Sequence, residues 1–240
     1  MSIRIIALAS CTLIGVFVCL PAVATGVDSN DFTAYVDLAS DYVRRGYSQT
    51  NANPALQLGL DFEHESGLFA GLRTSTVDFP SSGSFVDARE LELNLYAGYG
   101  RDLGRGWAAS ASMVHYEYFG DESTIDWDYT ELAAAVRFGR AALALAYSDS
   151  ALGSGDRGLA VELTDGWRLP AALELEAGIG FFDLESPFLE DYVYWSLKLL
   201  RPIKRFSLSL GYYDTDDRGQ AIWGELAEAR VIVGTTYLIR

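Results

Sequence analysis

Strict alternation of apolar and polar or small residues between Pro54 and His64 constrains the fold more than any other feature of this sequence. One side of the run is apolar and the other is not: Leu56, Leu58, Leu60 and Phe62 alternate with Ala55, Gln57, Gly59, Asp61 and Glu63. A repeat of two residues is the side-chain period of a β-strand, not of an α-helix. The turn Glu65-Ser66-Gly67 then reverses the chain, and the alternation resumes at Leu68. A β-hairpin is therefore predicted here.

The same hairpin unit recurs along the rest of the chain. We predict twelve strands near 32–43, 54–64, 68–78, 89–99, 107–118, 129–138, 141–148, 158–166, 172–182, 191–200, 205–213 and 226–238. Long polar connections at 44–53, 79–88, 119–128, 149–157, 183–190 and 214–225 alternate with short turns. No stretch of ten residues in this part of the chain has a clean helical period. Short turns at one end and long loops at the other are typical of an outer-membrane barrel. The predicted fold is all-β: a 12-stranded antiparallel up-and-down transmembrane β-barrel of outer-membrane type.

The first residues have the pattern of a secretory signal peptide. A basic start at Arg4 precedes an apolar run from Ile5 to Leu20, and an A-x-A site ends at Ala24. We expect residues 1–24 to be removed and residues 25–240 to form one barrel domain. Both cysteines, Cys11 and Cys19, fall in the removed part, so the mature chain has no disulfide and no thiolate chemistry.

Net charge limits the partners. Because Arg4 leaves with the signal, 17 basic residues remain against 33 acidic ones. Nucleic acid binding depends on clustered Lys and Arg that neutralise phosphates, so nucleic acid is not an expected partner. Small polar or cationic solutes fit this charge better.

Aromatic residues near the strand ends distinguish a membrane barrel from a soluble sandwich or lipocalin-like barrel, whose apolar side faces inward. We predict two girdles at the membrane interfaces. The girdle at the turn end consists of Phe62, Tyr99, Trp107, Phe138, Trp167, Phe206 and Tyr237, and that at the loop end of Tyr42, Phe79, Phe119, Tyr129, Tyr147, Tyr192 and Tyr212. Outer-membrane lipid, lipopolysaccharide and the barrel-assembly machinery are then expected partners, and Tyr237 could serve as the terminal aromatic that the machinery reads.

A signature in the first third of the chain resembles that of a known family. It consists of SDYVRRG at 40–46, SQT at 48–50, PALQ at 54–57 and ESGLFAG at 65–71. This signature is similar to that of the TorF-type porin family of proteobacterial outer-membrane proteins. The resemblance is specific within residues 33–79 and implies an outer-membrane barrel with a channel role. It implies no catalytic or ligand-binding residues.

If the apolar side of each strand meets lipid, the other side lines the lumen. The candidate pore-lining residues are Asp37, Asp61, Glu63, Arg73, Glu90, Glu92, Glu131, Arg137, Glu162, Glu174, Glu176, Glu228 and Arg230. Ten carboxylates against three cations would concentrate cations and repel anions. The alternative is that these side chains pair with one another in a polar core that closes a narrow barrel, because twelve strands lie between filled eight-stranded barrels and open porins. The phase near 107–118 and 141–148 is ambiguous, because Ala-rich runs lie there.

Arg44 and Arg45 form the one basic cluster in the predicted loops. Two functional interpretations are a latch that folds into the acidic mouth and an anchor for lipopolysaccharide phosphates, which match the guanidinium geometry. The simpler interpretation is a loop root that bends at Gly46.

An enzyme is the rival class, because some outer-membrane barrels are lipases or proteases. A serine nucleophile needs a histidine base, and the chain has only His64 and His115. No G-x-S-x-G or H-E-x-x-H motif is present, and the acidic run at 214–219 departs from calcium-loop spacing after its second acid. The sequence predicts a channel without catalytic residues, cofactor or metal, with a passive surface-contact protein as a third possibility.

Overall fold

The computed structural model describes residues 31–79, 89–120, 127–185 and 190–239. Its main strands are β1 (Asp31–Ala39), β4 (Ala55–Glu63), β5 (Leu68–Thr76), β6 (Arg89–Gly104), β7 (Trp107–Gly120), β8 (Tyr129–Phe138), β9 (Ala141–Ser148), β10 (Gly158–Leu169), β11 (Leu173–Leu184), β12 (Tyr192–Ile203), β13 (Phe206–Thr215) and β14 (Arg230–Leu238). Two short strands, β2 (Val43–Arg44) and β3 (Tyr47–Ser48), form a separate hairpin within the first loop.

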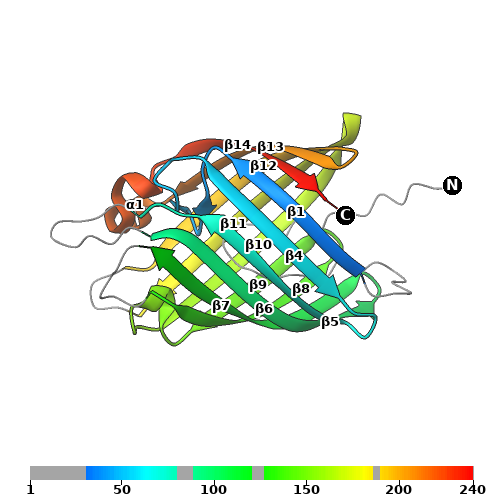
Figure 1. Cartoon of the computed structure of the whole chain (residues 1–240), viewed down its shortest axis with the longest axis horizontal. Coiled ribbons are helices and arrows are strands. Elements are labelled where there is room, and N and C mark those ends of the chain that lie inside the picture. The colour runs from blue at the N-terminus through cyan, green and yellow to red at the C-terminus, as the bar shows by residue number, and fades with distance from the viewer. Residues whose placement is uncertain (1–30, 80–88, 121–126, 186–189, 240) are drawn as a thin grey trace.

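The twelve main strands form one closed antiparallel barrel. Each strand pairs with its neighbour in sequence, and β1 closes the ring by pairing with β4 on one side and β14 on the other. Tight turns lie at one end of the barrel and the longer connections with α1 lie at the opposite end, as Figure 1 shows. Closure leaves no unpaired strand edge, which is a requirement for crossing lipid with strands. The predicted fold class is confirmed.

Strand positions agree closely with the alternation pattern. The predicted segments 129–138 and 141–148 coincide with β8 and β9. The largest differences are at β6, which continues to Gly104, at β1, which ends at Ala39, and at β14, which begins at Arg230. The predicted signal peptide lies outside the described residues.

The expectation of a chain without helices was wrong in the last loop. Helix α1 (Asp217–Trp223) is followed by the 3-10 helix η3 (Gly224–Ala227), and two further 3-10 turns are η1 (Ala151–Gly153) and η2 (Pro170–Ala172). Asp216 caps α1 by accepting a hydrogen bond from the Gly219 N–H at 3.0 Å. A helix of seven residues is too short to show a periodic pattern in a ten-residue window. Among the described residues, no helix is long and apolar enough to cross a membrane.

The apolar side of the strands faces outward. In β4, Leu56, Leu58 and Leu60 are each more than 40% exposed. Ala55 and Gln57, on the other side of the strand, are buried. The ambiguous strands follow the same rule, because Ala108 and Ala146 are buried while Met113 and Leu145 are exposed. An exposed apolar surface around a closed barrel matches the lipid-facing band of outer-membrane proteins.

The girdle at the turn end is present, but that at the loop end is divided. The Trp107 and Phe138 rings pack at a tilt, with centroids 4.6 Å apart, and Phe206 lies near Tyr237 at 4.8 Å. At the loop end the members on the outward side are Phe119, Tyr147 and Tyr212. Tyr129 and Tyr192 are buried inside the barrel, because they share the phase of Glu131 and Ser196. Tyr42, whose hydroxyl donates to Glu92, and Phe79, whose ring lies 6.1 Å from that of Tyr118, also pack against the interior. The assignment of these four residues to the girdle was wrong.

Several inward aromatic rings lie against glycines of the barrel wall. A Cβ added to Gly59 would meet the ring of Tyr35, and one added to Gly180 would meet the ring of Tyr194. The two glycines leave room for these rings beside the wall. Strand glycines often mark this kind of close approach.

Candidate functional site

The candidate site is the lumen of the barrel. Eleven of the thirteen predicted lining residues lie on the inward side of their strands: Asp37, Asp61, Glu63, Arg73, Glu92, Glu131, Arg137, Glu162, Glu174, Glu176 and Arg230. Their alternation with exposed apolar residues places them there.

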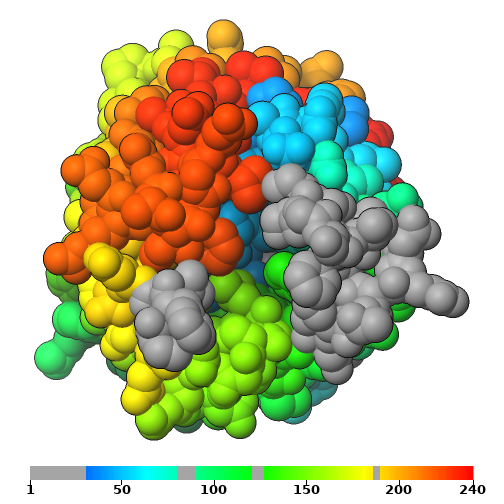
Figure 2. All heavy atoms as spheres, turned by 90° about the vertical axis from the view of Figure 1, so that its left-hand side faces the viewer, coloured from blue at the N-terminus to red at the C-terminus, as the bar shows by residue number. Residues whose placement is uncertain are grey.

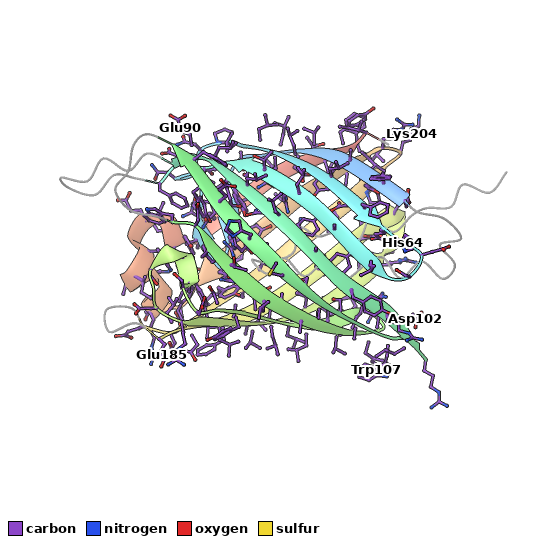
Figure 3. All side chains as sticks on the ribbon, turned by 60° about the horizontal axis from the view of Figure 1, so that its bottom comes forward. His64, Glu90, Asp102, Trp107, Glu185 and Lys204 are labelled. Atoms are coloured by element: carbon purple, nitrogen blue, oxygen red, sulfur yellow. The ribbon has the colours of Figure 1, made fainter. Side chains whose placement is uncertain are left out.

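Two predicted lining residues do not reach the lumen. Glu90 is exposed at the start of β6, where the register with β7 shifts between Arg89 and Leu91, so a local irregularity breaks the alternation. Figure 3 shows its side chain pointing away from the barrel at the loop end. Glu228 is exposed in the bend between η3 and β14, because the last strand begins at Arg230, four residues later than the predicted start at 226.

The loop between β1 and β4 folds into the barrel. Residues 44–50 are all buried, and they include all of the β2–β3 hairpin except its first residue, Val43. Arg45 and Gly46 both have positive φ, 49° and 83°, which is the combination that closes a two-residue hairpin of type I′. Figure 2 looks onto the loop end and shows residues from the blue part of the chain at the base of a hollow near its centre.

Asp41 organises this segment, which we call the loop-1 plug (residues 41–53). Its carboxylate accepts hydrogen bonds from the Ser48 hydroxyl at 2.6 Å and the Thr50 hydroxyl at 2.8 Å. It also accepts one from Arg230 Nη1 at 2.7 Å. Asp41 therefore holds the hairpin together and attaches it to the last strand.

The two arginines of the plug share one carboxylate on the barrel wall. Arg44 Nη2 lies 3.4 Å from Glu131 Oε2, and Arg45 Nη2 lies 2.8 Å from Glu131 Oε1. Glu131 also accepts a hydrogen bond from the Tyr116 hydroxyl at 3.1 Å. All three charged side chains are at most 3% exposed, so the ion pairs are shielded from solvent.

Aromatic rings enclose the two guanidinium groups. The Arg44 guanidinium lies over the Tyr116 ring at 4.1 Å and donates a hydrogen bond to the Tyr129 hydroxyl. The Arg45 guanidinium lies over the Phe182 ring at 4.4 Å. The backbone carbonyl of Arg45 accepts a hydrogen bond from the Tyr192 hydroxyl at 2.9 Å. Cations over ring faces are favoured, and more so when desolvated. Both arginines lie inside the barrel and neither is on the outer surface.

Two further glutamates lie in the same buried layer. Glu92 accepts hydrogen bonds from Asn94 Nδ2 at 2.7 Å, Tyr118 at 2.8 Å and Tyr42 at 3.2 Å. Glu162 accepts one from Tyr194. Burial raises the pKa of the Tyr42 phenol, and the nearby Glu92 carboxylate raises it further. Tyr42 therefore stays protonated and acts as a donor at physiological pH.

Nearer the middle of the barrel, basic and acidic groups are also paired. Arg73 Nη2 lies 3.5 Å from Asp37 Oδ2 and donates a hydrogen bond to Gln57. Lys198 is directly opposite Glu176 in the β11–β12 register and is 9% exposed. The predicted lining residues omit Lys198, although Lys198 is two positions from Ser196 and therefore lies on the same side of its strand.

Exposure divides the lumen into two halves. Toward the loop end, the inward charged residues Glu92, Glu131 and Glu162 are at most 3% exposed. Toward the turn end, Asp61, Glu63, Glu174, Glu176 and Arg137 are partly or fully exposed. We call these five residues the turn-end vestibule. Arg168 and Lys198 lie directly opposite Glu174 and Glu176 on the same inward side, so the four carboxylates outnumber the three cations Arg137, Arg168 and Lys198 by one.

Neither histidine joins the lumen carboxylates. His115 lies on the outward side of β7, and its Nδ1 is 3.0 Å from the Thr130 hydroxyl. His64 belongs to the turn after β4, where its Nδ1 is 2.8 Å from the Ser66 hydroxyl. Within the described ranges, no cluster of His, Cys, Asp or Glu could hold a metal ion.

A closed twelve-stranded barrel with an outward apolar band and a polar interior defines the class of bacterial outer-membrane β-barrels. Residues 23–237 match a family described as "Bacterial protein of unknown function (Gcw_chp)", and the chain belongs to that family. No curated protein matches the sequence.

Solved structures agree on the fold. The KdgM porin in complex with disordered oligogalacturonate is 9% identical, with a TM-score of 0.55 over 86% of this chain and 98% of that one. The NanC porin is 9% identical, with a TM-score of 0.54 over 86% and 99%. An outer membrane channel from Pseudomonas putida F1 is 12% identical, with a TM-score of 0.53 over 89% and 96%. These similarities extend over almost the full length of each barrel.

Proposed function

We propose that this protein is an outer-membrane channel that passes small solutes by passive diffusion and prefers cations. The observation that carries the proposal is the turn-end vestibule, whose side chains are partly exposed and whose four carboxylates outnumber the cations on the same side, Arg137, Arg168 and Lys198. A passage lined by one sign of charge between low-dielectric walls concentrates counter-ions. The likeness to porins and channels supports the transport role.

Several finer expectations belong to the same proposal. The chain would be exported by residues 1–24, inserted by the barrel-assembly machinery and surrounded by lipid and lipopolysaccharide, with the turns in the periplasm. The TorF-type assignment would fit this role and adds no catalytic step. Small polar or cationic solutes are the proposed cargo.

Reversal potentials across planar bilayers in a salt gradient test the cation preference. Wild-type protein should pass potassium in preference to chloride, and the preference should weaken when salt is raised, because the Debye length is about 10 Å at 0.1 M and shortens with salt. The double variant Glu63→Gln, Glu174→Gln should reduce the preference. Glu190→Gln, an exposed loop residue, is the matched control. Anion preference in the wild type would overturn the proposal.

A second candidate is a closed structural barrel without transport. The burial of Arg44, Arg45 and Glu131 across the loop end favours it. Liposome swelling with neutral and charged solutes separates the two candidates. A closed barrel admits no solute, whereas a channel admits small ones.

A further inference from the structure

We propose that the loop-1 plug is a displaceable gate and that its withdrawal opens a cation path along three buried glutamates. This inference rests on the proposed channel function and names how that channel is regulated. It follows from five features of the plug: its position, its internal bonding, the nature of its attachments, the incomplete hydrogen bonding of Arg45 and the charge of the wall behind it.

The plug occupies the lumen at the loop end. Connecting loops usually run over the surface, because buried backbone needs partners for every polar group. Here Tyr47, Ser48, Gln49 and Thr50 are at most 4% exposed. Their burial places a loop between the exterior and the turn-end vestibule.

The plug satisfies much of its hydrogen bonding by itself. The β2–β3 pairs, the Gln49 N–H to the Tyr42 carbonyl at 2.6 Å and the Thr50 hydroxyl to the Asn53 carbonyl at 2.7 Å are all internal. Asp41 adds its bonds to Ser48 and Thr50. A segment bonded in this way can move as a unit without losing its own structure.

The attachments to the barrel are made mainly by side chains. Among the described residues, one backbone hydrogen bond joins the plug to another element, from the Asp78 N–H to the Gln49 carbonyl at 2.8 Å. The side-chain attachments include the arginine pairs with Glu131, the Asp41 pair with Arg230 and the Tyr47 ring stacked on Trp223 at 4.1 Å. Hydrogen bonds also join Tyr42 to Glu92, Arg44 to Tyr129, the Arg45 carbonyl to Tyr192 and Asn53 to Asp78. Such contacts can break without unzipping a strand.

Docking leaves Arg45 incompletely satisfied. Its Nη2 is 2.8 Å from Glu131, yet none of its three nitrogens makes an aligned hydrogen bond within the described structure. Burying unmade donors of a charged group is unfavourable, and the open state in water does not carry this penalty. The free-energy difference between the docked and withdrawn states therefore contains two opposing contributions. The ion pairs with Glu131 favour docking, and the unmade donors of Arg45 favour withdrawal, so the plug can move reversibly between the two states.

Withdrawal also changes the charge of the passage. With the plug docked, Arg44 and Arg45 neutralise Glu131. Without it, the wall at this depth carries Glu92, Glu131 and Glu162, which continue the negative surface of the turn-end vestibule. The open channel should therefore select cations more strongly than any leak through the docked state.

Single-channel recording in planar bilayers tests the gate with a plug-shortened variant, in which residues 42–50 are replaced by Gly-Gly. We expect its open fraction to exceed that of wild type by about tenfold or more, because the buried ion pairs are gone. Its reversal potential should shift further toward that of potassium. Arg157→Gln, which breaks an exposed pair with Glu185 at the same end, is the control and should behave as wild type. Heat-modifiable migration on gels confirms that each barrel is folded.

A second variant holds the plug in place. Tyr47→Cys with Trp223→Cys, bridged by a short bifunctional thiol reagent, should abolish opening, and cleavage of the bridge should restore it. The only natural cysteines, Cys11 and Cys19, precede the described barrel.

The outcomes separate the gate from the channel. If wild type and the plug-shortened variant conduct equally and the bridge has no effect, the gate is refuted while the channel stands. If the folded plug-shortened variant conducts nothing, the proposed function fails and the gate fails with it. If the plug-shortened variant conducts with a preference for anions, the predicted path along the glutamates is refuted.

Discussion

Arg230 Nη1 donates a hydrogen bond of 2.7 Å to Asp41 Oδ2, which joins the first residue of the last strand to the base of the first loop. The contact lies directly above the β1–β14 seam, whose register extends from Tyr35–Leu238 to Ala39–Gly234. The Ser40 N–H continues the seam by donating to the Val233 carbonyl at 2.9 Å. The ion pair therefore helps to close the barrel and to hold the plug.

Replacing Arg230 should destabilise the barrel. Arg230→Gln leaves the Asp41 carboxylate, only 6% exposed, without its cation, and it removes the donors to the Glu225 and Leu226 carbonyls. Breaking one partner of a buried pair costs about 3 kcal/mol. Guanidinium unfolding of detergent-folded protein measures the loss. Arg218→Gln, which breaks an exposed pair with Glu190, should change stability by less than about 0.5 kcal/mol. Equal effects of the two changes would contradict the assignment.

Gly180 should not tolerate a side chain. A Cβ at this position would lie 2.2 Å from the Tyr194 ring, which is fully buried and donates to Glu162, so the ring has nowhere to move. Gly180→Ala should cost about 1–3 kcal/mol through overpacking. Gly166→Ala is the matched control, because the nearest atom there is the Leu175 carbonyl oxygen at 3.8 Å. Urea or guanidinium midpoints compare the two, and a neutral Gly180→Ala would show that the ring yields.

Because one side of each strand faces lipid and the other faces the lumen, an arginine introduced on the outward side should destabilise the barrel and one introduced on the inward side should not. Ile179 is 51% exposed on the outward side of β11, and Thr164 faces the lumen from β10. Ile179→Arg should lose about 2–4 kcal/mol, the penalty for arginine near the bilayer midplane. Thr164→Arg should be tolerated, because it meets the acidic interior. Refolding into lipid vesicles measures both, and a reversed order would mean that the apolar side faces inward.

The fold could be predicted wherever apolar and polar side chains alternate with a period of two residues. Leu56 to Phe62 and Leu91 to Ala97 alternate without interruption, so the strands and their outward side could be read directly. The pattern carries no information at irregularities, which explains the errors at Glu90, beside a register shift, and at Glu228, beyond a short helical segment. The same logic explains why Tyr129 and Tyr192 were placed in the girdle: their position along the strand was correct, but their phase points inward.

The candidate site was less predictable. Alternation indicates which side chains face inward, but it does not indicate which of them contact one another. The pairing of Arg44 and Arg45 with Glu131 joins residues more than 80 positions apart. It depends on a loop that turns back into the barrel at Arg45 and Gly46. The sequence offered the latch as one option, with no local signal that separated it from an exposed loop. The acidic bias of the predicted lumen was likewise too large, because Arg44, Arg45 and Lys198 also lie inside.

Glu131 should control the accessibility of the plug to protease. In the docked state Arg44 and Arg45 are 2% and 1% exposed, so trypsin should spare the bonds that follow them while it cuts at exposed sites such as Arg157. Glu131→Gln removes the carboxylate that both guanidinium groups share, and loss of such a partner typically costs about 3 kcal/mol.

Because cleavage follows the population of the open form when opening is fast, the Glu131→Gln variant should be cut after Arg44 or Arg45 about a hundredfold faster than wild type. Mass spectrometry of the fragments identifies the cut, and cleavage at Arg157 provides an internal standard for protease activity. Glu185→Gln, which breaks only the exposed pair with Arg157, should leave the plug protected. Rapid cleavage at Arg44 in the wild type would show that the arginines are not held by Glu131, whereas slow cleavage in Glu131→Gln would assign the docking to Asp41 and the surrounding tyrosines.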